Sequence, residues 1–128
     1  MRGHLRAETD ERVEAFVAMD RFNRPHTIYS INDPETGVPL YIGQTVNLSR
    51  RIREHLKLRP GKASTKFLEP MLRAGVDPEF VTLAVVPDRK TADAIEIEEI
   101  NNALDAGHSL YNAAHELNRA RKIRRRKA

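Results

Sequence analysis

Arg51 and His55 are four residues apart, a spacing that places two side chains on the same face of a helix. A guanidinium can hold two phosphate oxygens at once, and an imidazole can donate a hydrogen bond or transfer a proton near neutral pH. The apolar residues around them, Leu48, Ile52 and Leu56, define a buried stripe that this face borders. The pair is therefore suited to binding a phosphate, although two solvated residues on a basic helix would show the same spacing.

Glu96 is a carboxylate that the helical period places among apolar residues. In projection it falls on the same arc as Ala92, Ile100 and Ala103. Burying a carboxylate is costly unless it is paired or binds a metal. Glu96 is therefore the candidate ligand for a hard cation such as Mg²⁺, which needs few protein oxygens and keeps several waters. A salt bridge to a nearby arginine would explain the same pattern.

Three other carboxylates lie in the same predicted helix. Glu98 falls on the polar side and Glu99 at the border between the two faces, so both fit a metal less well but stay open as alternatives to Glu96. Asp93 falls inside the apolar arc. Because it lies in the first helical turn, where a carboxylate interacts favourably with the helix dipole, we expect a structural role for it.

Tyr29 and Tyr41 lie in two short runs of β-forming residues, separated by the turn-forming stretch at residues 32–37. Alternate residues of a strand share a face, so an antiparallel hairpin can bring both phenols to one face of a sheet. Tyrosines of an ordinary core or surface would show the same pattern.

The elements that must position these side chains follow from hydrophobic periodicity and from cap and turn residues. Asn47 is the expected N-cap of the helix that carries Arg51 and His55, and Gly75 is the expected end of the next helix. The order predicts an α+β fold, in which helices surround a small antiparallel sheet. The predicted helices cover residues 8–22, 48–59, 64–74, 87–106 and about 111 onward, and the predicted strands cover 26–31, 38–43 and 78–86.

Composition excludes several classes of protein. The 128 residues are enough for one domain with a core, and the absence of cysteine excludes a disulfide framework, a cysteine-based zinc site and a thiol nucleophile. No apolar run is long enough to cross a membrane, and the charged N-terminus does not resemble a signal peptide. We expect a soluble cytoplasmic protein with no membrane partner.

Basic residues are concentrated in two blocks, within a net charge of +4 and a pI of about 9.7. One block surrounds Arg50 and Arg53, and the other is the C-terminal run, which contains no acidic residue. Such blocks indicate a polyanionic partner, with nucleic acid as the first candidate, although the C-terminal run could also serve solubility. The predicted nucleic-acid contacts are Arg50, Arg53, Arg121, Lys122, Arg124 and Arg125.

Taken together, these segments resemble the GIY-YIG nuclease superfamily. The resemblance runs from about His26 to Asn112, and its specific part is the stretch from Tyr41-Ile42-Gly43 to His55. The first motif segment is Thr27-Ile28-Tyr29, with threonine in place of the first glycine. A helix bearing Glu96 and the pair Tyr111-Asn112 follow in the expected order.

The resemblance implies a three-stranded antiparallel sheet flanked by helices and phosphodiester hydrolysis with a single divalent metal. We expect an extra N-terminal helical extension at residues 1–24, the nuclease domain at 25–114 and a basic C-terminal helix or tail at 115–128. The resemblance implies that Tyr29 positions water or acts as general base, and that Tyr41 contacts the phosphate or its water. Gly43 would allow a close backbone turn before the helix and contact the nucleic acid. The other implied roles are charge stabilisation by Arg51, an active-site histidine at His55, a metal ligand at Glu96 and support of the site by Asn112.

These inferences predict a Mg²⁺-dependent endonuclease, with Mn²⁺ as a possible substitute, that cuts duplex or branched DNA. A catalytically silent binding module of the same fold and an RNA-directed nuclease are the alternatives. No separate recognition domain is evident, so we expect low sequence specificity, structure-directed cutting or a recruiting protein partner.

Overall fold

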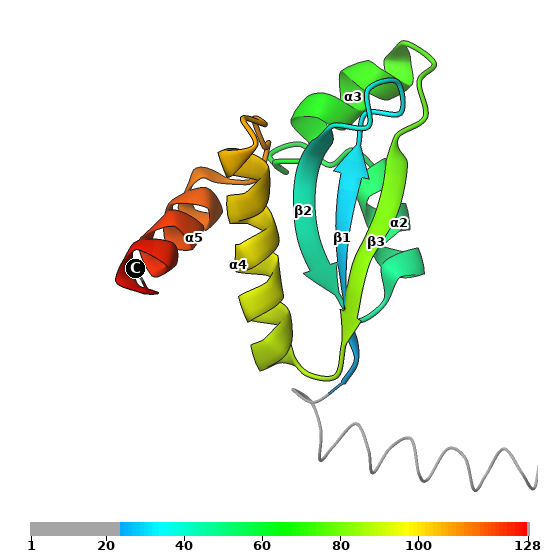
Figure 1. The fold of residues 1–128 in the computed structure, drawn as a ribbon. Coiled ribbons are helices and arrows are strands. Elements are labelled where there is room, and N and C mark those ends of the chain that lie inside the picture. The colour runs from blue at the N-terminus through cyan, green and yellow to red at the C-terminus, as the bar shows by residue number, and fades with distance from the viewer. Residues whose placement is uncertain (1–23, 128) are drawn as a thin grey trace, which may run out of the picture.

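The structure, a computed structural model, describes residues 24–127, and it confirms the predicted α+β fold (Figure 1). The helix predicted at residues 8–22 lies outside the described residues. In chain order the elements are β1 (His26–Asn32), β2 (Pro39–Thr45), α2 (Leu48–Leu56), α3 (Thr65–Arg73), β3 (Glu79–Val86), α4 (Arg89–Asp105) and α5 (Ala114–Lys127).

The three strands form one antiparallel sheet in the order β2-β1-β3. The turn between β1 and β2 is closed by the backbone of Gly37, which donates to the Asp33 carbonyl at 2.8 Å and has a positive φ of 74°. The resulting register places Tyr29 of the central strand directly opposite Gly43 of the edge strand β2. This pairing positions the site described below.

Helices cover both faces of the sheet (Figure 1). Ile28 of β1 points to one face, where it packs with Ala92 and Ile100 of α4. The next residue, Tyr29, points to the other face and packs in a cluster with Phe67 of α3 and Leu48 of α2. Because strand side chains alternate, β1 contributes to two separate cores, one beneath α4 and α5 and the other beneath α2 and α3.

The helix boundaries follow the predicted cap residues in most places. The Asn47 side chain accepts a hydrogen bond from the Arg50 backbone amide and so caps α2 as expected, and Gly75 follows α3 with a positive φ of 77°. The helix α2 ends at Leu56, earlier than the predicted Arg59, and Leu58 then takes a positive φ of 54°. The chain therefore turns sharply before α3.

The last helix begins at Ala114, so its predicted start near Tyr111 is wrong. The backbone amide of Tyr111 instead donates to the Leu40 carbonyl of β2 at 2.7 Å. The segment before α5 is therefore tied to the sheet edge.

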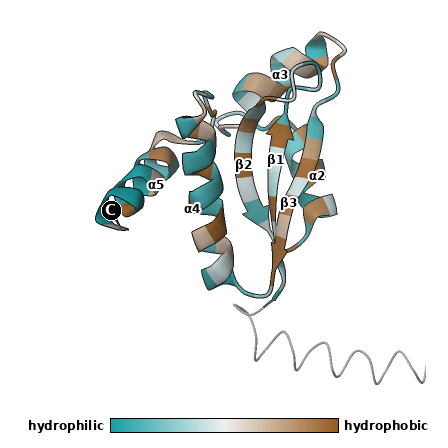
Figure 2. Cartoon of the chain, viewed as in Figure 1, coloured by the Kyte–Doolittle hydropathy of each residue, from teal (hydrophilic) through white to brown (hydrophobic). Residues whose placement is uncertain are grey.

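The basic C-terminal run is helical, as expected, and packs against α4. Ala120 is fully buried at this contact, Leu117 packs beside it, and the Asn101 side chain donates to the Ala120 carbonyl at 2.9 Å. Figure 2 shows that the rest of α5 is predominantly hydrophilic. Across residues 24–127, every helix is too short or too polar to cross a membrane.

Candidate active site

Tyr29, Tyr41 and His55 form an aromatic cluster on the face of the sheet that α2 covers. The ring centroids of Tyr29 and Tyr41 are 6.3 Å apart, and His55 lies 5.8 Å from the first ring and 5.4 Å from the second. The β1–β2 hairpin thus brings both phenols to one face of the sheet, as its strand alternation predicts.

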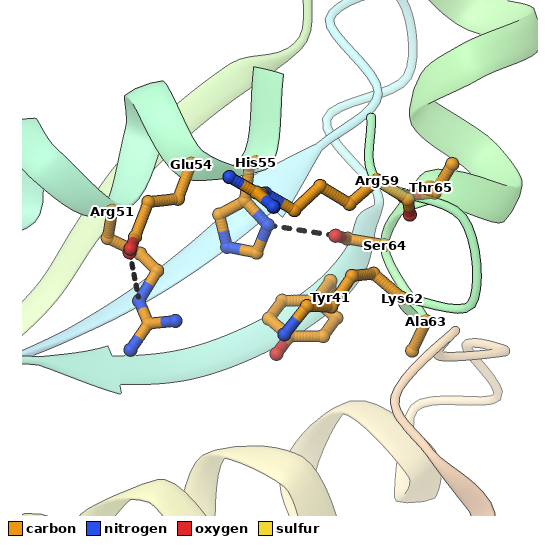
Figure 3. A pocket seen from close by; sticks show the side chains of 9 residues that line it. All are labelled: Tyr41, Arg51, Glu54, His55, Arg59, Lys62, Ala63, Ser64 and Thr65. Atoms are coloured by element: carbon orange, nitrogen blue, oxygen red, sulfur yellow. Dashed lines mark hydrogen bonds and ion pairs between the residues drawn. The ribbon is translucent and has the colours of Figure 1, made fainter. Parts of the chain in front are cut away.

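The His55 imidazole is held from both sides. Its Nε2 lies 2.7 Å from the Tyr29 hydroxyl and its Nδ1 lies 2.8 Å from the Ser64 hydroxyl (Figure 3). Burial, and then the nearby Arg51 guanidinium, lower the pKa of His55 to about 4. A neutral imidazole has one donor and one acceptor nitrogen, so one of the two hydroxyls donates to the ring and the other accepts from it.

Both phenols are uncharged near neutral pH. Burial raises the pKa of Tyr29 well above its usual range, with Tyr41 adding to the effect. Burial also raises the pKa of Tyr41 to about 12, and the Glu116 carboxylate contributes. Tyr29 can therefore donate its hydroxyl proton to His55, and its oxygen lone pairs can still accept a hydrogen bond from water.

Gly43 makes room for the Tyr29 hydroxyl. A Cβ at this position would lie 2.7 Å from the Tyr29 hydroxyl oxygen and 2.9 Å from its ring carbon Cζ. Gly43 lies within β2 and lacks the positive φ of a turn glycine, so the expectation that it serves a close turn before the helix is wrong. Its absent side chain instead lets the Tyr29 hydroxyl approach the strand backbone.

Arg51 lies between two cavities. On one side is the carboxylate cavity, whose charged lining residues are Arg51, Arg89, Asp93, Glu96, Glu116 and Arg119. On the other side is the cationic cavity, drawn in Figure 3, which includes Tyr41, Arg51, His55, Arg59, Lys62 and Ser64. The Arg51 Nε atom is buried without a hydrogen-bond partner, since the Glu54 carboxylate is 3.8 Å away. An unsatisfied buried donor at this junction suits an anionic ligand.

Glu96 lines the carboxylate cavity next to Asp93. The Gln44 side-chain amide donates to Glu96 Oε1 at 3.0 Å and to Asp93 Oδ1 at 2.6 Å. Burial raises the pKa of Glu96, and Glu116 and Asp93 add to the rise, while the Gln44 hydrogen bond and the Arg119 guanidinium oppose it. Asp93, expected to be only structural, therefore shares both a donor and a cavity with Glu96.

The alternative metal ligands point elsewhere. Glu98 and Glu99 line two other cavities, the first with Ile123 of α5 and the second with Leu83 of β3. Neither lines a cavity with Tyr29 or Arg51. The helical phase that favoured Glu96 therefore agrees with its placement.

Asn112 contacts the backbone of β2. Its Oδ1 accepts from the Ile42 amide at 3.0 Å, and its Nδ2 donates to the Ile42 carbonyl at 2.7 Å. Ile42 lies between Tyr41 and Gly43, so these two bonds fix the strand segment that carries both. Asn112 is placed as a positioning residue for the site.

A family model for the GIY-YIG catalytic domain matches residues 25–112, which is most of the chain. The chain belongs to the GIY-YIG family. Neither the curated proteins nor the solved structures compared with the chain gave a match. Membership implies a nuclease-type function and a nucleic-acid substrate for this GIY-YIG domain.

GIY-YIG nucleases generally use a divalent metal, and the carboxylates of this domain fit one. Glu96 accepts from Gln44 with one oxygen, which leaves its other oxygen for a cation. Among residues 24–127, no group of three or more histidine and acidic side chains is arranged to enclose a metal. Glu96 would therefore hold the ion together with waters and substrate phosphate, as suits Mg²⁺.

The predicted nucleic-acid contacts of the GIY-YIG domain divide into two groups. Arg121 and Arg124 of α5 are both bound to the Asp105 carboxylate of α4, Arg121 at 2.8 Å. The exposed residues Arg50, Arg53, Lys122 and Arg125 form no ion pair within the described part of the chain.

Sequence reasoning assigned no role to three polar residues of the site: Gln44, Ser64 and Glu116. The position of Gln44 could have been predicted, since it lies two residues after Ile42 and therefore shares the face of β2 that packs against α4. Ser64 resembled an ordinary N-cap, but its hydroxyl makes no capping bond and contacts His55 instead. Glu116 reaches the site only because α5 packs on α4, which the sequence pattern does not reveal.

Proposed function

We propose that this GIY-YIG domain is a metal-dependent endonuclease that hydrolyses DNA phosphodiester bonds. The observation that carries the proposal is the charge arrangement of the carboxylate cavity. Three carboxylates and three arginines line it, yet none of these six side chains forms an ion pair with another. Opposite charges kept apart in one cavity suit a ligand that is itself a cation–phosphate pair.

The Tyr29–His55 pair supplies the path for a proton. With its proton on Nδ1, bound to Ser64, the imidazole accepts from the Tyr29 hydroxyl at Nε2. Tyr29 then orients water with its lone pairs. As the water oxygen bonds to phosphorus and the bond to the departing sugar oxygen breaks, the proton of water passes to Tyr29 and the Tyr29 proton passes to His55. The departing oxygen takes a proton from solvent, and His55, whose pKa is about 4, releases the proton it received to solvent.

Arg51 and a metal ion held by Glu96 would stabilise the negative charge that develops on the phosphate during the reaction. The unpartnered Nε of Arg51, with the rest of its guanidinium, is suited to the phosphate oxygens. A Mg²⁺ or Mn²⁺ ion, when bound at Glu96, would stabilise the charge that develops on phosphorus. Gln44 keeps the Glu96 carboxylate oriented toward the cavity.

DNA is the proposed substrate, and the exposed cations of α2 and α5 support it because they suit a polyanionic backbone. Arg50 and Arg53 on α2, with the cations of α5, give affinity for a phosphate backbone that is independent of sequence. A panel of duplex, flap, single-stranded DNA and RNA separates the substrates. Faster cleavage of RNA than of every DNA form would replace DNA as the substrate.

The deciding experiment compares Glu96→Gln with Glu98→Gln on supercoiled plasmid in Mg²⁺ or Mn²⁺. Both variants remove one carboxylate from α4, but only Glu96 lines the carboxylate cavity. We expect a loss of about 10³-fold for Glu96→Gln and little change for Glu98→Gln. Equal rates for Glu96→Gln and the unchanged protein would refute the assignment. Binding without cleavage by the unchanged protein in both metals would identify a silent binding module.

A further inference from the structure

The lining of the cationic cavity includes two residues with no role in the proposed reaction, Arg59 and Lys62, which follow α2 in the chain. The cavity shares Tyr41 and Arg51 with the carboxylate cavity. Figure 3 shows the side chains of Arg59 and Lys62 extending over the cavity toward His55 and Tyr41. Two cations therefore lie beside the reacting groups, on the side away from Glu96.

Neither Arg59 nor Lys62 has a counter-ion within residues 24–127. The single carboxylate of the cavity, Glu54, is directed to Arg51 at 3.8 Å. The cavity thus contains three cationic side chains and one carboxylate, and the excess of positive charge at Arg59 and Lys62 favours an anionic ligand.

The backbone that carries these cations is ordered. The Thr65 hydroxyl donates to the Arg59 carbonyl at 2.7 Å, and the Thr65 amide donates to the Lys62 carbonyl at 3.1 Å. Leu58, held at a positive φ of 54°, packs in the core cluster that contains Tyr29. The two cations therefore start from fixed positions, which reduces the entropy lost when they bind a ligand.

We infer that the cationic cavity is a second phosphate subsite, which binds the backbone phosphate next to the scissile one. The inference rests on the proposed nuclease function, because the ligand is part of the same nucleic-acid strand. Arg59 and Lys62 bind this neighbouring phosphate, while Arg51, at the junction of the two cavities, binds the scissile one. Such a subsite fixes the register of the strand without reading bases.

The test combines protein variants with neutral phosphate analogues. The double variant Arg59→Gln/Lys62→Gln is compared with Lys57→Gln, which removes a charge at an exposed neighbouring position outside the cavity. The substrates are a short oligonucleotide with one cleavable linkage and the same oligonucleotide with a methylphosphonate at the linkage before or after it. Thermal unfolding verifies that each variant is folded.

We expect the double variant to raise KM for the unmodified substrate about tenfold, with kcat within about twofold. One of the two methylphosphonates should raise KM of the unchanged protein similarly and leave the double variant unaffected. The slope of log Kd against log salt concentration should decrease by about 1 for the double variant. Lys57→Gln should change KM by less than about twofold.

Two results would overturn the subsite. One is that the effects of the double variant and of the methylphosphonate on KM add together at both flanking linkages. The other is that Lys57→Gln raises KM as much as the double variant does. If the unchanged protein cuts no substrate, the nuclease proposal fails by itself. The salt dependence of binding then decides the subsite, since an unchanged slope in the double variant contradicts it.

Discussion

The helices α4 and α5 bring carboxylates and arginines together at two places, and the charges are paired at only one of them. In the C-terminal halves, Arg121 and Arg124 of α5 bind the Asp105 carboxylate of α4. In the N-terminal halves, Glu96 of α4 and both Glu116 and Arg119 of α5 line one cavity and form no ion pair. The ion pairs of the C-terminal halves join the two helices, and the charges of the N-terminal halves remain available to a ligand.

The pKa shifts of the two regions express this difference. Hydrogen bonds from Arg121 and Arg124 hold the pKa of Asp105 below its usual range, because they stabilise the charged form. Burial among other carboxylates raises the pKa of Glu96. A raised pKa means that the charged form of Glu96 lacks a stabilising partner, which a bound cation would supply. The carboxylate cavity is therefore better suited to a cation than the paired carboxylate of Asp105.

After Glu96→Gln, the next largest effect is expected from Gly43→Ala, which adds one methyl group beside the carboxylate cavity. The new Cβ would lie 2.7 Å from the Tyr29 hydroxyl, and the buried Tyr29 ring has little room to move. Displacement of the hydroxyl would break its bond to His55, so we expect kcat to fall about 10²-fold. Single-turnover cleavage gives the measurement. A rate within twofold of the unchanged protein would show that the close approach is dispensable.

Ser64→Ala should have a smaller effect, since Ser64 acts on the reaction only through His55. Loss of the Nδ1 partner frees the imidazole tautomer, and we expect kcat to fall about tenfold with KM unchanged. Ser64→Thr keeps the hydroxyl and should restore most of the rate. The dependence of kcat on pH should shift in Ser64→Ala and not in Ser64→Thr. Equal rates and pH profiles for both variants would indicate a merely structural serine.

Acid should destabilise the fold through His55. The pKa of His55 is about 4 in the fold against an ordinary value of 6.5, so between these pH values the unfolded chain binds more protons. Stability contributed by neutral His55 is present above pH 6.5 and is lost as the pH falls to 4. The Tm of His55→Gln should therefore decrease less than the Tm of the unchanged protein when the pH falls from 6.5 to 4. Parallel Tm curves for both proteins would contradict the pKa shift. Burial is the main cause of the lowered pKa, Arg51 and Lys62 add to it, and Glu54 opposes it.

The smallest effect is expected from Asp105→Asn in the paired region. The change frees Arg121 and Arg124, so affinity for DNA should rise about twofold and depend more steeply on salt. Cleavage at saturating substrate should not change, because Asp105 lies outside both cavities. Fluorescence anisotropy at several salt concentrations gives the measurement. A weaker affinity would show that the pairing itself positions α5 for binding.

The sequence revealed those parts of the site that depend on local periodicity. Helical phase placed Arg51 with His55 and singled out Glu96 from Glu98 and Glu99, and the Asn47 cap fixed the start of α2. These features depend on residues within a few turns of one element, which the repeat of 3.6 residues encodes.

The remaining contacts depend on how separate elements approach each other. Ser64 faces His55 because a loop folds back onto α2, and Glu116 faces Glu96 because Ala120 packs α5 against α4. Gly43 has its role because the strand register places it opposite Tyr29. None of these relations has a sequence period, so local patterns do not predict them.

The double hydrogen bond of Asn112 with Ile42 has a consequence for the solubility of the protein. The strand β2 is an edge of the sheet, and an edge with free amides and carbonyls is a template for pairing with another chain. The Asn112 side chain binds β2 as a peptide group of a fourth strand would, and the Tyr111 amide adds a third bond. The segment that contains Tyr111 and Asn112 thus also occupies part of the β2 edge, which hinders edge-to-edge aggregation.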